Sequence, residues 1–81
     1  MFLHVGNEIL VEYSRIIGVF DMNDSAVAKH IKERDLFAGK HAVYISEQDI
    51  KSCVLTDEKI YYSNISPATL MRRSINVLNM G

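Results

Sequence analysis

The chain has 81 residues, which is the length of one small domain spanning 1–81, and its formal net charge is −1. This balance excludes nucleic-acid binding driven by net charge alone. With 48 % apolar residues, the chain either builds a dense core or leaves apolar surface for a partner, often a second copy of itself. The charges are unevenly spread: the ten acids all lie at or before Glu58, and only the cations Lys59, Arg72 and Arg73 follow.

The cysteine content and the hydropathy of the sequence indicate the cellular compartment of the protein. Cys53 is the single cysteine, so the sequence predicts no intramolecular disulfide, no cysteine-based zinc site and a small buried thiol. No apolar run approaches the ~20 residues that cross a bilayer, and the N-terminus lacks the basic region of a signal peptide. We therefore expect a cytoplasmic protein with no cofactor and no membrane partner.

The first 21 residues predict a meander of three strands. Gly6-Asn7 separates two short runs and favours a tight hairpin turn, and a second break falls at Ser14-Arg15. Between Glu8 and Tyr13 alternate residues share a face, which predicts one buried face and one largely solvated face. The first face holds Ile9, Val11 and Tyr13, and the second holds Glu8, Leu10 and Glu12. Ile16 to Phe20 is apolar on both faces and predicts a central strand, in which Gly18 marks either a bulge or a close backbone approach.

The middle of the chain predicts one peripheral helix followed by three strands. Asn23-Asp24-Ser25 supplies N-cap candidates for a helix that runs to about Leu36, and Gly39 is placed to end it. Tyr61 and Tyr62 alternate within the last strand, so we expect one to be buried and the other exposed. The three strands are predicted over His41 to Ile45, Lys51 to Thr56 and Lys59 to Ser63.

Ser66-Pro67 opens a final amphipathic helix, with serine as the N-cap and proline at the first helical position. We expect its apolar arc to pack on the sheet and both arginines to face solvent. The fold class is therefore α+β: a small, mainly antiparallel sheet of about six strands built from hairpins, with two helices, the C-terminal one packed on the sheet. The apolar arc holds Leu70, Met71, Ile75, Val77 and Leu78, and the polar arc holds Thr69, Arg72, Arg73 and Asn76.

Catalytic and metal chemistry finds little support in the sequence. His4, His30 and His41 lie far apart and lack metal-ligand spacing. The sequence has no glycine-rich phosphate loop and no nucleophile elbow. We therefore predict that the protein is not an enzyme; a solvent-lined pocket holding His41 with a carboxylate would revive that class. The acids Glu47, Asp49, Asp57 and Glu58 fall in predicted turns, where solvated carboxylates are ordinary.

Cations are the candidates for recognition. Arg15 stands at a strand junction, where its guanidinium should be exposed, and Arg72-Arg73 lie on the open face of the last helix. Lys40 and Lys51 flank the fourth and fifth strands. Each alone is an ordinary surface charge, and phosphate binding requires that they converge or that symmetry repeats them. A ring of identical subunits would neutralise many phosphates along DNA, because counterion release scales with the number of contacts.

Several segments resemble the RemA/RemB family of small bacterial regulators, and within it the RemB branch. The resemblance covers nearly the whole chain and is loosest in the first helix and from Gly39 to Asp49. It implies control of the transcription of extracellular-matrix genes, and RemA-type members look like ring-forming DNA-binding proteins. The matching segments are His4-Val5-Gly6, Ser14 to Asp21, Lys51 to Thr56, Ile60 to Ser63, Ser66, Thr69-Leu70 and Arg72-Arg73.

The resemblance also bears on the candidate DNA contacts, which are Arg15, Lys51, Arg72 and Arg73. Arg15 falls where RemA-type proteins carry an arginine implicated in DNA contact. Where that branch has an arginine pair, this chain has Gln48-Asp49, with Lys51 nearby. We predict an oligomeric DNA-binding regulator of matrix (biofilm) genes; the alternative is a protein-interaction or ligand-sensing module that never contacts DNA. A basic rim on the oligomer favours the first, and a neutral or acidic rim favours the second.

Overall fold

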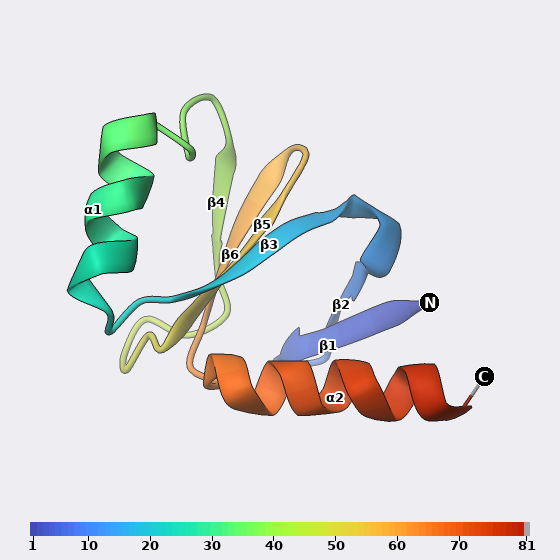
Figure 1. Cartoon of the computed structure of the whole chain (residues 1–81). Coiled ribbons are helices and arrows are strands. Elements are labelled where there is room, and N and C mark those ends of the chain that lie inside the picture. The colour runs from blue at the N-terminus through green and yellow to red at the C-terminus, as the bar shows by residue number, and fades with distance from the viewer. Residues whose placement is uncertain (81) are drawn as a thin grey trace.

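Six strands form a two-stranded ribbon and a four-stranded sheet, and the chain also has two helices (Figure 1). The computed structural model describes the backbone of residues 1–80 and the side chains of residues 1–73. This architecture confirms the α+β class, and three of the four strand pairings are antiparallel. In chain order the elements are β1 (Phe2–Gly6), β2 (Ile9–Glu12), the 3-10 turn η1 (Tyr13–Arg15), β3 (Ile16–Asp21), α1 (Ser25–Arg34), β4 (His41–Tyr44), β5 (Ser52–Thr56), β6 (Lys59–Ser63) and α2 (Pro67–Met80).

The predicted three-stranded meander is wrong. β1 pairs only with β2, and η1 then redirects the chain so that β3 leaves the ribbon and pairs with β5. The four-stranded sheet has the order β3-β5-β6-β4, so β3 is an edge strand and the prediction of a central strand is also wrong. The bulge near Gly18 is confirmed, because the β3–β5 register shifts between Ile16 and Gly18.

The turn of the ribbon lies one residue later than predicted. Asn7 and Glu8 form it with φ of 49° and 61°, the left-handed conformation that a tight hairpin turn requires. Gly6 ends β1 with φ of +118°, and an added Cβ would lie 2.8 Å from Ile45 Cγ2. Glycine is therefore needed at this position both for its backbone angle and for its close approach to Ile45.

The four-stranded sheet carries an apolar cluster on each face. On one face Val54 packs with Leu70 and with the inward side of the ribbon, Leu3, Val5 and Val11. On the other face Cys53, Leu55 and Ile60 form a second cluster, with Leu36 and Phe37 among the side chains packed against it. Tyr61 packs on the first cluster and Tyr62 on the second, and both are half-buried. The prediction that one would be exposed is wrong because both faces are covered.

The hydroxyl of Ser63 ties the ribbon to the sheet. It lies in β6, is fully buried, and donates to the carbonyl oxygen of Val5 at 2.7 Å while accepting from the Ile65 N–H at 3.0 Å. We expect Ser63→Ala to lower the free energy of unfolding by about 1–3 kcal/mol, because it leaves a buried carbonyl unpaired. Urea melts would measure the change. A melt that matches the wild type would show that the ribbon does not depend on this bond.

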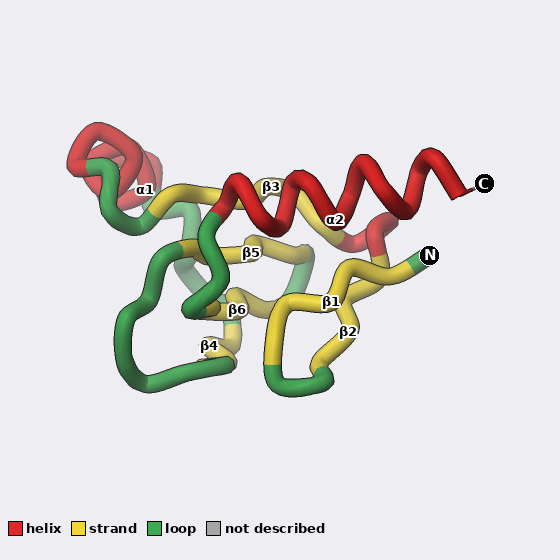
Figure 2. Tube along the Cα trace, turned by 90° about the horizontal axis from the view of Figure 1, so that it is seen from below, coloured by secondary structure: helices red, strands yellow, loops and turns green. Residues whose placement is uncertain are grey.

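Helix α1 begins as predicted but ends earlier. The Asp24 carboxylate caps it by accepting from the Ala26 and Val27 N–H groups at 2.9 and 3.4 Å. The helix stops at Arg34, because Asp35 adopts a left-handed conformation (φ 51°), which aspartate tolerates. Gly39, predicted to end the helix, lies in the loop before β4. Figure 2 shows α1 at one end of the four-stranded sheet and α2 alongside the ribbon.

Helix α2 begins as predicted and packs against β1 and β3. Ser66 Oγ accepts from the Thr69 N–H at 3.2 Å, which confirms the serine N-cap. Leu70 is 1 % exposed, as its position on the apolar arc predicted, but Met71 is 60 % exposed. Among the described side chains of α2, Leu70 therefore belongs to the arc that contacts the domain and Met71 lies outside it. The predicted packing of Ile75, Val77 and Leu78, and the predicted exposure of Asn76, lie outside the described side chains.

Candidate functional site

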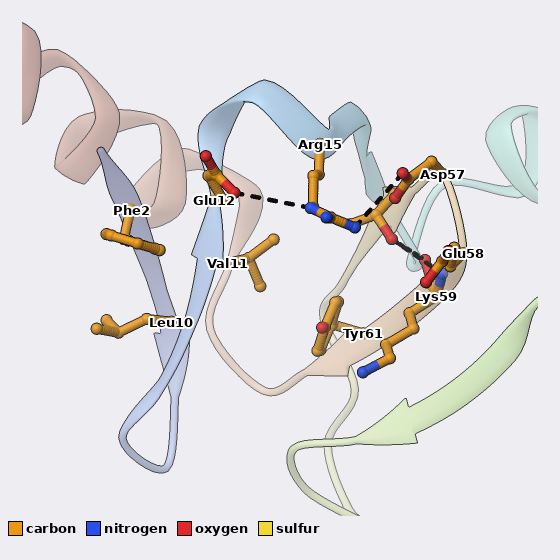
Figure 3. Close-up of a pocket in the computed structure, with 10 residues that line it drawn as sticks. Phe2, Leu10, Val11, Glu12, Arg15, Asp57, Glu58, Lys59 and Tyr61 are labelled. Atoms are coloured by element: carbon orange, nitrogen blue, oxygen red, sulfur yellow. Dashed lines mark hydrogen bonds and ion pairs between the residues drawn. The ribbon is translucent and has the colours of Figure 1, made fainter.

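A half-open groove of about 250 Å³ separates the ribbon from the β5–β6 hairpin (Figure 3). One part of its wall is apolar and comes mainly from the ribbon. The other part is charged and comes from η1, the end of β2 and the hairpin turn. The lining residues are Phe2, Leu10, Val11, Glu12, Arg15, Thr56, Asp57, Glu58, Lys59 and Tyr61.

Arg15 spans the charged part of the groove. Its Nε lies 3.7 Å from Glu12 Oε2, and its Nη1 lies 3.6 Å from Asp57 Oδ2. The Arg15 side chain is 55 % exposed, which agrees with the exposure predicted for it at a strand junction. Exposed ion pairs of this kind contribute about 0–1 kcal/mol each, so the guanidinium can exchange these carboxylates for another anion at small cost.

The groove carries more acid than base. Glu12, Asp57 and Glu58 contribute three carboxylates, and Arg15 and Lys59 contribute two cations. No histidine lines it, so the pairing of His41 with a carboxylate that would indicate an enzyme is not formed in this groove. The described residues also contain no group of three or more histidine, cysteine or acidic side chains that could hold a metal ion.

The two lysines near the fourth and fifth strands do different things. Lys40 Nζ donates to the carbonyl oxygens of Thr56 and Asp57 at 3.1 and 2.7 Å, so it fastens the hairpin turn beside the groove. Lys51 directly precedes β5 and is exposed. Lys51 therefore lies at the first end of β5, whereas Arg15 contacts Asp57 just after its last residue. Five strand residues at about 3.3 Å each separate the two ends of β5 by roughly 15 Å. The structure therefore does not bring Lys51 and Arg15 together.

The two helix arginines also differ. Arg72 is exposed, as predicted. Arg73 is half-buried: its Nη1 donates to the His4 carbonyl oxygen at 2.8 Å and lies 3.4 Å from His4 Nδ1. The prediction that both arginines face solvent is thus wrong for Arg73, because that side chain clamps α2 onto β1.

Most of the groove is not predictable from the sequence. Glu12 lies three residues before Arg15, and that spacing alone could have suggested the ion pair. Asp57 is 42 positions away from Arg15 in the sequence, and its contact follows from the β3–β5 pairing, for which the sequence offers no local signal. The apolar wall is not predictable from the sequence, because a strand pattern does not show that Phe2 and Leu10 share one surface.

The Cys53 thiol is chemically inert because it is buried among apolar side chains. It is fully buried in the second cluster, and this burial raises the pKa of the Cys53 thiol to about 12. We expect native protein at pH 8 to resist a disulfide reagent that labels one thiol per chain in denaturant. Because the unfolded thiol ionises near pH 8.5, this group favours unfolding as pH rises above about 9. Fast labelling of native protein would contradict the buried placement.

Two comparisons with known proteins identify the family. The RemA-like family, described as extracellular matrix regulatory protein A-like, matches residues 2–73. The chain belongs to this family. It is also similar to extracellular matrix regulatory protein B of Bacillus subtilis (strain 168), with 37 % identity over 75 residues that cover 91 % of this chain and 90 % of that protein. The resemblance read from the sequence is thereby confirmed.

The RemA-like match includes all four candidate DNA contacts, since Arg15, Lys51, Arg72 and Arg73 lie within residues 2–73. Within this RemA-like chain they occupy three separate places: the groove, the start of β5 and the face of α2. Of these four side chains, only Arg15 lines the groove. None of the helices in the described part of the chain has the length and apolarity needed to cross a membrane.

Proposed function

We propose that this RemA-like protein is a homo-oligomeric, non-enzymatic regulator of extracellular-matrix (biofilm) gene expression that acts in the cytoplasm and binds DNA through Arg15. The observation that carries the proposal is the placement of Arg15. Its exposed guanidinium sits on a short 3-10 turn next to the groove, and only weak ion pairs hold it. Because the Arg15–Asp57 pair is exposed and 3.6 Å long, a phosphate oxygen can compete with the Asp57 carboxylate for the guanidinium.

Binding by one copy would be weak, and this is why the proposal includes self-association. The chain has a net charge of −1, and three carboxylates surround the two cations of the groove. Repetition of Arg15 around an assembly multiplies the phosphate contacts on one DNA molecule. Large apolar side chains are available for assembly, because Phe2, Leu10, Ile17, Tyr44 and Met71 are all exposed.

The same groove supports a second candidate, a protein-interaction module that regulates through a partner without touching DNA. Here the specific observation is the excess of acid around Arg15, which suits a cationic peptide better than a phosphate. On this reading Arg15 holds the ribbon against the hairpin and recognises nothing itself.

Two measurements on the purified protein decide between these candidates. Native mass spectrometry gives the mass of the assembly at tens of micromolar, and a gel shift with mixed-sequence DNA at low and moderate salt gives binding. We expect an oligomer that shifts DNA at low salt and releases it as salt rises. An oligomer that fails to shift DNA at low salt would favour the protein-interaction module, and a clean monomer would remove self-association.

A further inference from the structure

We propose that the groove of one copy receives the exposed face of α2 from a second copy, with Met71 against Phe2 and Leu10 and Arg72 against Asp57 and Glu58. This inference rests on the proposed homo-oligomer and says which surfaces join its subunits. It also gives Arg72 a role other than phosphate contact.

The acceptor surface combines an apolar patch with an acidic one. Phe2 and Leu10 are 53 % and 57 % exposed. The pairings Phe2↔Glu12 and His4↔Leu10 place both on the outer face of the ribbon, where they are diagonal neighbours within reach of one long side chain. Asp57 and Glu58 stand across the groove at the hairpin turn (Figure 3). Glu58 forms no ion pair among the described side chains, so its carboxylate is available to a cation.

The donor surface has the complementary chemistry. Met71 and Arg72 are adjacent on α2, and both are exposed. Leu70 packs in the core and Arg73 is held by His4, so the neighbours on either side turn this pair away from its own domain. The sequence has no acidic residue after Glu58, so the charged side chains of α2 are all cations. The groove, in contrast, carries more carboxylates than cations. Opposite charge steers such a contact and fixes its register.

Placement in the fold makes the contact intermolecular. α2 runs along the β1 side of the ribbon, and the groove opens between the ribbon and the β5–β6 hairpin (Figures 1 and 3). Met71 and Arg72 do not line the groove of their own copy. Donor and acceptor are thus different surfaces, and their contact is head-to-tail. A head-to-tail contact closes into a ring when its rotation divides a full turn.

A charge-swap experiment tests this contact. We expect Arg72→Glu and Glu58→Lys each to raise the concentration needed for assembly by about tenfold or more, because each places like charges across the interface. Combining the two substitutions should restore assembly to near the wild-type concentration. The measurement is light scattering over a dilution series, with native mass spectrometry at one concentration. Lys32→Glu on the exposed side of α1 carries the same charge change outside the proposed contact and should assemble like the wild type.

Each other outcome has a definite meaning. Arg72→Glu that assembles like a wild-type oligomer overturns this interface and leaves the proposed function standing. If Arg72→Glu and Glu58→Lys each dissociate the assembly and the double variant does not restore it, the two side chains do not pair. That result also overturns the proposed interface. Arg72→Glu that assembles normally but loses DNA binding makes Arg72 a DNA contact and not an interface residue. A monomeric wild type overturns both this interface and the proposed oligomer.

Discussion

Replacing Arg15 by alanine is expected to weaken DNA binding by about tenfold or more, because the loss is repeated in every subunit that contacts the same DNA. The expectation depends on Arg15 being exposed at the rim of the groove. Each lost phosphate contact should also reduce the log–log salt slope by about 0.9. Fluorescence anisotropy at two salt concentrations measures both quantities on one DNA.

The matched control for Arg15→Ala is Lys32→Ala on α1. It removes the same charge from an exposed site away from the groove and should change affinity little. Because Arg15 also bridges Glu12 and Asp57, the mass and melting curve of the variant must be checked alongside. Unchanged affinity in an intact Arg15→Ala assembly would remove Arg15 from the site.

Leu70→Ala is expected to lower the free energy of unfolding by about 2–5 kcal/mol. Leu70 is 1 % exposed and joins α2 to both the ribbon and the sheet, through Leu3, Val5, Val11 and Val54. Truncation leaves a cavity where three elements meet, so little backbone can move in to fill it. In a chain of this size such a loss is a large share of the total stability.

Met71→Ala is the control for Leu70→Ala, because the two residues are adjacent on α2 and Met71 is exposed. We expect its urea melt to match the wild type when both are diluted to single copies, because Met71 is exposed on its own domain and contacts only the second copy of the proposed interface. If Leu70→Ala melts like Met71→Ala, α2 does not pack on the ribbon as described.

Local signals in the sequence located the elements of this fold. Ser66 is recognisable as an N-cap, and Asp24 is one of three adjacent candidates, because these side chains satisfy N–H groups only two or three residues away. The alternation in Ile9–Glu12 correctly placed Val11 inside and Leu10 outside. The exposure of Met71 is not predictable in the same way, because the helical wheel of an isolated segment does not show how wide its docking surface is.

Strand order was beyond the reach of local signals. β3 reads as central because both of its faces are apolar, and both faces are indeed packed, with Val19 on one cluster and Phe20 on the other. Burial of a strand's faces, however, does not determine whether both of its edges are hydrogen-bonded. The candidate site is limited in the same way. The sequence predicts Arg15 as an exposed cation, but it does not predict Asp57 as its partner, because the β3–β5 pairing brings the two together.

The salt dependence of DNA binding by the wild-type assembly tests the proposal most directly. Each phosphate contact contributes about 0.9 to the slope of log affinity against log salt. Several copies of Arg15 on one DNA should therefore give a slope of several units, measured at a concentration where the mass of the oligomer is established. A slope near that of a single contact, or no binding at about 50 mM salt, would contradict the repeated Arg15 site.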